Sequence, residues 1–313
     1  MKNEVFDFYD RTMLKSYNLD KTMQEQLNAL GRLDVFTRKH CENVAAITCR
    51  LCSYLHQPKW FTEYCTICAY LHDIGKIFIP PEILQKPGKL TEEEYNIIKT
   101  HTTIGYNMCM KDLKLRPYAA GPYYHHEALN GSGYPQGLTA KDIPYEAQII
   151  RVADEYDAIV SKRQYKTHIG ISDTLKILIE NTKPQKTSSE ASGKITQNTK
   201  LGKNNAKVVK ALIKVVLEDI YYEIFSVENY IKYLKDNIKR LNQIEDYYNK
   251  MQNSKTQDKK EYFLEYMKMF FEKEENIDNF LQILDDYKQT LLQKEAQINN
   301  LQNEIKIIKK LKV

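Results

Sequence analysis

Apolar residues recur at helical spacing over most of this 313-residue chain. Between residues 34 and 56 there is no glycine or proline, and Val44, Ile47 and Leu51 share one helical face with His40. A histidine on a core-facing stripe needs a partner, which a backbone carbonyl or a metal ion can supply. The pattern predicts a helix that carries His40 into the core.

A second helix is expected after the break at Pro58. Residues 61–73 carry His72 and Asp73 near the helix end, and Gly75 suits its C-terminal cap. This helix therefore presents an imidazole and a carboxylate side by side at its last turn.

A third helix begins at a capping box, because Thr91 and Glu94 have the Thr-x-x-Glu spacing. The apolar stripe of this helix, which includes Ile97 and Ile98, continues to His101. On spacing alone, a core histidine bonded to the backbone and a metal ligand are equally good interpretations of His101.

Residues 124–138 hold too many glycines for a regular helix, so we expect a helix end followed by an ordered loop. Residues 145–161 then predict another helix, on which Asp154 and Asp157 share a face. We expect Asp157 to support the structure or a neighbouring ligand.

The last third of the chain has no strong helix breaker and predicts long helices, the first over residues 205–252 with a polar break near 254–257. A heptad stripe follows, charged only at Lys294, with a and d positions at Ile277, Phe280, Leu284, Tyr287, Leu291, Lys294, Ile298, Leu301, Ile305 and Ile308. The stripe predicts a coiled-coil segment that forms a parallel homodimer. The alternative is an antiparallel hairpin that folds back on residues 227–252 of the same chain.

The helical patterns predict an all-α protein, and a length of 313 residues with 42% hydrophobic content predicts two regions. The net charge of +5 is small beside 46 basic and 41 acidic residues, so it gives no case for duplex nucleic acid or for a membrane surface. No run approaches the ~18 apolar residues of a membrane span, and the first ten residues are too acidic for a secretory signal. We expect a cytoplasmic protein without a membrane span.

The six cysteines include two pairs with zinc-site spacing, Cys49-x-x-Cys52 and Cys65-x-x-Cys68. Zinc knuckles are turns, yet neither pair contains a glycine or proline and both lie in helical patterns. We expect buried, reduced thiols that pack as small hydrophobic side chains.

Two doublets point to chemistry: His72-Asp73 and His125-His126. Imidazole beside carboxylate is the ligand set of divalent Zn, Fe or Mn ions. Taken alone, either doublet is equally well interpreted as metal ligands or as a structural pair in the core or on the surface. Glycines next to both doublets make two such coincidences improbable.

The chain resembles the HD-GYP family, a branch of the HD-domain metal-dependent phosphohydrolases. The resemblance rests on three motifs in order, His72-Asp73-Ile74-Gly75-Lys76, then His125-His126-Glu127 with Gly131-Ser132-Gly133-Tyr134-Pro135, then Val152-Ala153-Asp154-Glu155-Tyr156-Asp157-Ala158 running into Arg163-Gln164-Tyr165-Lys166. It covers about residues 1–225 and implies an HD-GYP-like domain there, followed by a helical extension over 226–313. Residues 181–205, rich in lysine and polar side chains, are expected to be a flexible insertion in that domain, and a basic nucleotide-binding loop is the less favoured interpretation.

The resemblance implies a ligand set of five imidazoles and two carboxylates: His40, His72, Asp73, His101, His125, His126 and Asp154. Seven ligands are too many for one tetrahedral ion and suit two metals that share a carboxylate, which the resemblance assigns to Asp73. Nitrogen-rich ligation favours Fe or Mn, with Zn as a further candidate, over Mg or Ca.

The resemblance further implies catalytic roles for Asp73 and Lys76, and substrate binding by Lys76, Gly133, Tyr134, Arg163 and Lys166. The implied reaction is hydrolysis of cyclic di-GMP to linear pGpG and onward to GMP, with a metal-bridging hydroxide as the nucleophile. Two alternatives stay open: a phosphohydrolase for another cyclic dinucleotide, nucleotide or phosphomonoester, and a catalytically weak metal-binding scaffold that signals to partner proteins.

Some HD-GYP proteins hold a third metal through a glutamate one helical turn before the histidine that corresponds to His40. Here that position is Phe36, which has no donor atom, and the nearest preceding acid, Asp34, lies about 120° around the helix from His40. We therefore expect two metals, and accumulation of the linear dinucleotide ahead of GMP.

Overall fold

The computed structural model describes residues 35–161, 170–184 and 201–313. These residues form helices and no named strand; a single bridge joins Asn130 and Thr139. The expected all-α class is confirmed. The chain divides into two compact units, residues 1–216 with 310–313 and residues 217–309, and the predicted boundary after residue 225 falls inside the second.

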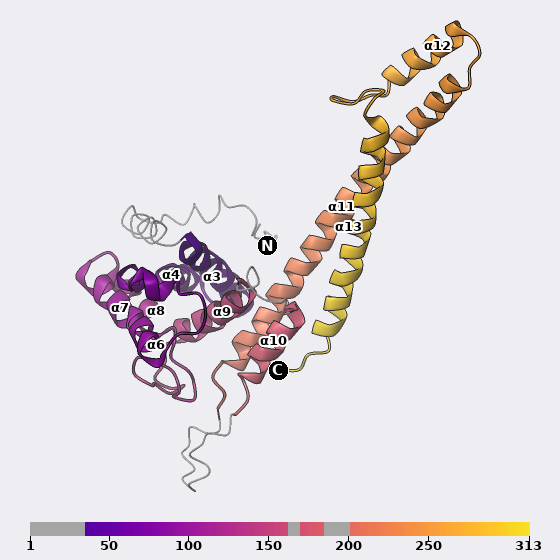
Figure 1. Ribbon diagram of the computed structural model, residues 1–313. Coiled ribbons are helices and arrows are strands. Elements are labelled where there is room, and N and C mark those ends of the chain that lie inside the picture. Colours follow the sequence, from indigo (N-terminus) through magenta and orange to yellow (C-terminus); the bar gives the residue numbers. More distant parts are fainter. Residues whose placement is uncertain (1–34, 162–169, 185–200) are drawn as a thin grey trace. The chain divides into compact units, whose positions relative to one another are not determined.

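The first unit is a cluster of mostly short helices (Figure 1). In chain order they are α3 (Val35–Tyr54), α4 (Lys59–Leu71), η1 (Ile74–Phe78), α5 (Pro81–Leu84), α6 (Glu92–Lys99), α7 (His101–Lys111), η2 (Arg116–Tyr118), α8 (Ala120–Tyr124), α9 (Tyr145–Ser161) and α10 (Ile171–Glu180). Helix α3 packs on both α4 and α9, and α7 packs on η1 and α8. The core is therefore built where α3, α4 and α9 meet.

One local expectation about the helix that begins after Thr91 needs correction. The capping box at Thr91 and Glu94 is present, but the helix that it opens ends at Lys99, and Thr100 separates α6 from α7. The hydroxyl of Thr100 donates to the carbonyl of Ile97, which satisfies a terminal acceptor of α6. The predicted single helix through His101 is wrong, because the chain breaks there without a glycine or proline.

The second unit contains the longer part of α11 (Ala206–Gln252), α12 (Gln257–Lys268) and α13 (Phe280–Ile308). Helices α11 and α13 run side by side in opposite directions (Figure 1), joined by Lys235–Glu295 and by Gln297 donating to Glu223. All ten heptad positions are at least partly buried. The stripe therefore packs on α11 of the same chain, which is the hairpin alternative.

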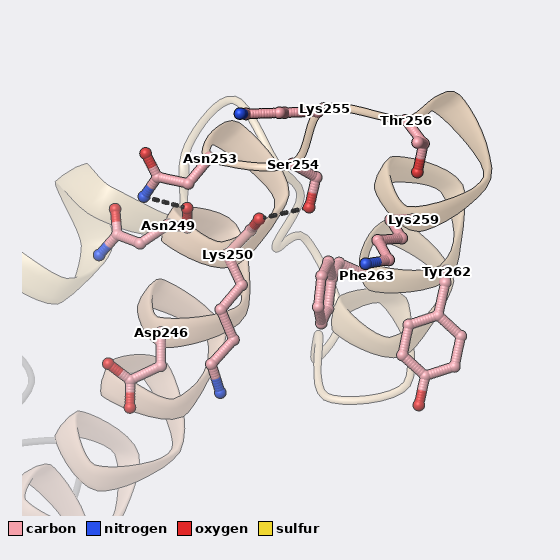
Figure 2. A pocket seen from close by; sticks show the side chains of 10 residues that line it. All are labelled: Asp246, Asn249, Lys250, Asn253, Ser254, Lys255, Thr256, Lys259, Tyr262 and Phe263. Carbon is pink, nitrogen blue, oxygen red and sulfur yellow. Dashed lines mark hydrogen bonds between the residues drawn. The ribbon is translucent and has the colours of Figure 1, made fainter.

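A pocket lies where α11 gives way to α12, lined by residues that include Lys250, Lys255, Lys259 and Tyr262 (Figure 2). No residue of the predicted metal site lines it. None of the described helices has a stretch that is both long and apolar enough to cross a membrane.

Candidate metal centre

All seven predicted ligands lie together in the first unit. They come from α3 (His40), the end of α4 (His72), the start of η1 (Asp73), the first residue of α7 (His101), the end of α8 (His125, followed by His126) and α9 (Asp154). Three overlapping groups, His40-His72-Asp73, His72-His125-Asp154 and His101-His125-His126, each have ligand atoms within 4.8 Å of one another. The arrangement could hold metal ions at more than one point.

Asp73 lies between two sets of imidazoles and is 1% exposed. Its Oδ2 atom is 3.3 Å from His72 Nε2 and 3.7 Å from His40 Nε2. Its Oδ1 atom is 3.3 Å from His101 Nε2 and 4.0 Å from His125 Nε2. One carboxylate therefore presents a different oxygen to each set, which is the arrangement that a bridging ligand requires.

The outer nitrogens of three histidines are fixed by backbone carbonyls. The Nδ1 atoms of His72 and His101 lie 2.7 Å from Ala69 O and 2.6 Å from Ile98 O. Likewise, His125 Nδ1 lies 3.0 Å from two carbonyls at the end of α8. Because a carbonyl only accepts, Nδ1 carries a proton in each ring, so Nε2 is the atom that each ring can offer to a metal.

His40 is oriented by a carboxylate instead. Its Nδ1 atom lies 2.7 Å from Asp157 Oδ2, and its Nε2 atom 3.0 Å from Asp154 Oδ1. Asn43 donates to the second oxygen of Asp157. Asp157 therefore supports a ligand and does not itself reach the centre.

Burial and charge divide the histidines into two classes. Burial lowers the pKa of His101 to about 4 and of His126 to about 3, and it lowers the pKa of His125 well below its usual value. Burial also opposes protonation of His40, but hydrogen bonds to Asp154 and Asp157 outweigh it and raise its pKa to about 9. Burial of His72 is likewise outweighed by Asp73, which raises the pKa of that ring well above its usual value. Three rings are therefore neutral donors, and metals that bind His40 and His72 have to displace a proton from each.

Two atoms at the centre are buried without a hydrogen-bond partner, His72 Nε2 and Asp73 Oδ1. An unsatisfied buried polar group costs about 1–3 kcal/mol, more when it is charged. Both atoms are ligand types for Zn, Fe or Mn and both face the other ligands. The residues present therefore fit a metal centre.

Lys76 is the cation closest to Asp73, with Nζ 2.6 Å from Asp73 Oδ2. Burial opposes its charge, but Asp73 outweighs that effect and raises the pKa of Lys76, so the ammonium stays protonated. In turn, burial of Asp73 is outweighed by Lys76 and His72, which hold the pKa of its carboxyl well below the usual range.

Gly75 permits the close approach on which the site depends. A Cβ atom there would lie 2.0 Å from the carbonyl oxygen of His101 and 2.6 Å from the backbone nitrogen of Gly105. Gly75 lies within η1 rather than capping α4, so the predicted cap is wrong. Its missing side chain lets η1, which follows His72 and Asp73, pack on α7.

The loop after His126 is held by Glu127, which is 1% exposed. Its carboxylate accepts the backbone N–H groups of Gln136 at 2.7 Å and of Leu138 at 2.9 Å. Gly133 packs against the backbone of residues 126–128, where a Cβ atom would lie 2.3 Å from Ala128 N. The sequence shows Glu127 inside the motif, but nothing in its spacing indicates this structural role.

The ring of Tyr134, one of the predicted substrate-binding residues, stacks on His126 at a centroid distance of 4.6 Å. Arg151 of α9 supports the same region by donating to the carbonyl of His126 at 3.2 Å and to Asn204 at 2.9 Å. The backbone N–H of Leu129 donates to Lys203 O. The chain after residue 200 therefore buttresses this loop.

The ends of the predicted insertion meet at Asn181, whose carbonyl oxygen accepts N–H groups from Lys203 at 2.7 Å and Asn204 at 3.0 Å. Most of the insertion, together with the predicted phosphate-binding residues Arg163 and Lys166, lies outside the described residues.

The six cysteines are all buried and free, as expected. Burial raises the pKa of Cys65 and of Cys68. Zinc binds the thiolate, so a raised pKa disfavours the zinc interpretation of these two pairs.

Comparison with known proteins identifies the family. The HD domain family model matches residues 14–187, more than half of the chain. A cyclic di-GMP phosphodiesterase of Thermotoga maritima is 38% identical over 188 residues, which are 53% of this chain and 51% of that relative. The 3′3′-cGAMP-specific phosphodiesterase 1 of Vibrio cholerae is 32% identical over 151 residues, 48% of this chain and 35% of that protein.

The chain thus spans about half or less of the length of these relatives. Among solved structures, the HD-GYP-type protein Bd1817 of Bdellovibrio bacteriovorus matches with a TM-score of 0.43 and 20% identity, over 56% of this chain and 51% of that one. Together with the three motifs around the centre, the family match shows that the chain belongs to the HD domain family, in its HD-GYP branch.

Proposed function

We propose that this chain is a metal-dependent phosphodiesterase that hydrolyses cyclic di-GMP to the linear dinucleotide pGpG. The observation that carries the proposal is Asp73, whose two oxygens face two separate sets of imidazoles. A paired metal site of this kind suits phosphodiester hydrolysis. The names of several relatives, such as the Thermotoga phosphodiesterase, support the choice of substrate.

In this proposal His40, His72, Asp73 and Asp154 hold one metal, and Asp73, His101, His125 and His126 hold the other. Fe or Mn fits this nitrogen-rich set best, with Zn as a further candidate. When bound, such metals lower the pKa of water from ~15.7 toward ~7 and offset charge on phosphoryl oxygens. Phe36 supplies no third ligand site, so we propose two metals per chain.

In this proposal, side chains of the protein bind and orient the phosphate groups of the substrate. Lys76, held charged beside Asp73, offsets negative charge that develops on the transferring phosphoryl group. Arg163 and Lys166 are proposed to bind phosphate as well. Tyr134, stacked on His126, forms one wall of the site.

The test is incubation with cyclic di-GMP, and in parallel with 3′3′-cGAMP, under anaerobic Fe(II), Mn(II) and Zn(II), with the products separated by chromatography. We expect pGpG from cyclic di-GMP, with GMP appearing later, and two metal equivalents per chain. Faster cleavage of 3′3′-cGAMP would reassign the substrate. No cleavage of any diester with metal bound would favour the scaffold alternative.

A homodimer through the C-terminal helices stays a prediction. The heptad stripe already packs on α11 of the same chain, so a dimer that uses this stripe requires the hairpin to open. Light scattering on the full chain and on a chain truncated after Gln252 tests it, because only a dimer that the truncation abolishes supports this interface.

A further inference from the structure

One edge of the metal centre carries an aromatic and cationic group that the ligand set does not use. Tyr134 stacks on His126, and the Nζ atom of Lys99 lies 5.9 Å from the centroid of the Tyr134 ring. The same Nζ atom lies 4.5 Å from the centroid of Tyr95, which is 45% exposed. The ammonium of Lys99 is therefore one aromatic ring away from a metal-ligand candidate.

The position of this ammonium is fixed rather than free. Asn96 Oδ1 accepts a hydrogen bond from Lys99 Nζ at 3.0 Å, and the cation also lies within cation–π distance of the rings of Tyr95 and Tyr134. Among the residues that the structure describes, no carboxylate forms an ion pair with Lys99. Its charge is consequently available to an anion that approaches the centre along Tyr134.

A plainer interpretation is that Lys99 only complements the dipole of α6, in whose last turn it lies. Lys111 occupies the matching place in the last turn of α7 and is exposed. No aromatic ring or acceptor is recorded around Lys111 among the described residues. Comparison of Lys99 with Lys111 therefore distinguishes anion binding from simple complementation of a helix dipole, because of these two lysines only Lys99 has an ammonium held by neighbouring groups.

We infer that Lys99 binds the second, non-scissile phosphate of the dinucleotide while the metal centre engages the first. The inference rests on the proposed function, since a cyclic dinucleotide carries two phosphates and only one is cleaved at a time. Tyr134 is close to both binding points, because its ring stacks on His126 and its centroid lies 5.9 Å from Lys99 Nζ. Lys99 is thus a specificity-determining residue for substrates that carry a second phosphate.

The test compares Lys99→Gln with wild type on two substrates. With cyclic di-GMP we expect KM to rise about tenfold, as for loss of a hydrogen bond to a charged group, and kcat to stay within about twofold. With bis(4-nitrophenyl) phosphate, a diester without a second phosphate, we expect both constants to remain at the wild-type value. Lys99→Arg should restore most of the affinity for cyclic di-GMP.

Lys111→Gln is the matched control and should leave KM unchanged on both substrates. Metal content, measured by elemental analysis, should be the same in all variants. An unchanged KM for cyclic di-GMP in Lys99→Gln, or an equal rise on both substrates, overturns the inference while leaving the proposed function intact. Failure of the wild type to cleave cyclic di-GMP overturns the proposed function itself and, with it, the inference.

Discussion

The candidate metal centre of the first unit and the cluster around Arg240 in the second differ in how their buried polar groups are paired. In the first, His72 Nε2 and Asp73 Oδ1 are buried at the centre of the fold with no hydrogen-bond partner. In the second, the guanidinium of Arg240 bonds to both oxygens of Glu275, at 2.6 and 2.7 Å, and to Phe270 O at 2.8 Å. Buried polar groups that are hydrogen-bonded to one another stabilise the fold, whereas buried polar atoms without a hydrogen-bond partner are available to a ligand.

Substitution of Asp73 should have the largest effect on the difference between the two units. Asp73→Ala removes the carboxylate that faces both imidazole sets, so we expect loss of bound metal and a fall in phosphodiesterase activity of more than about a hundredfold, beyond the usual effect of residues that only orient a ligand. Elemental analysis beside a kinetic assay measures both effects. Lys76→Ala is the control, because it should keep the metal and lose rate. Equal metal content in wild type and Asp73→Ala would contradict the bridging role.

The packing that assembles the centre can be broken separately at Gly75. In Gly75→Ala the new Cβ atom would meet the backbone of His101 at 2.0 Å, so η1 and α7 must move apart. We expect about 3 kcal/mol of lost stability and weaker metal retention, as for overpacking against rigid backbone. Chemical denaturation measures the stability change. Gly88→Ala, where no atom lies within 4 Å, controls for the added methyl group, although its φ of +115° carries a strain of its own.

Support of a single ligand should give a smaller effect. Asp157→Ala removes the acceptor that orients His40, and we expect metal affinity to fall about 10- to 100-fold, as for other residues that orient a ligand. Competition with a chelator measures the affinity. Asp157→Asn retains an acceptor oxygen and should fall between wild type and Asp157→Ala. A metal affinity that is unchanged in Asp157→Ala would show that His40 is held by its helix alone.

The smallest effect is expected in the second unit. Arg240→Ala leaves Glu275, whose side chain is 6% exposed, without its partner, and should cost about 2 kcal/mol of stability with no loss of metal. Lys235→Ala, which breaks the exposed pair with Glu295, should cost less than about 0.5 kcal/mol.

This pair also predicts a pH dependence. The hydrogen bond from Arg240 lowers the pKa of Glu275, so the pair stabilises the fold above the unfolded pKa of about 4.3. That contribution is lost progressively as pH falls from this value through the lower pKa of the folded state, where the carboxyl becomes protonated. Denaturation curves between pH 3 and 7 should therefore converge for wild type and Arg240→Ala at the acid end, and a constant difference would contradict the pairing.

Much of this architecture follows from the sequence. Helical periodicity predicted α3 and α9 almost to the residue, and the motif resemblance named the seven side chains, Asp73 among them, that the structure brings together. These features are local or strongly patterned. The stop at Thr100 was missed because a threonine hydroxyl bonding to Ile97 O can end a helix without any breaker residue.

Features that depend on tertiary partners could not be predicted in the same way. The heptad stripe of α13 indicates an apolar face but not which helix covers it, and here it is α11 of the same chain. The role of Glu127 depends on where the backbone of Gln136 and Leu138 lies in space. The role proposed for Lys99 depends on the position of Tyr134, which stacks on His126 and lies near the Lys99 ammonium.

The carbonyl of Asn181 has a consequence for the length of the chain. Because it accepts N–H groups from both Lys203 and Asn204, the domain closes the connection between residues 184 and 201 by contacts made outside that segment. Each doubling of the segment's length then costs only about 0.6 kcal/mol of loop-closure entropy. Changes in the length of the chain between residues 184 and 201 should therefore leave Leu129, in the loop after His126, bonded to Lys203.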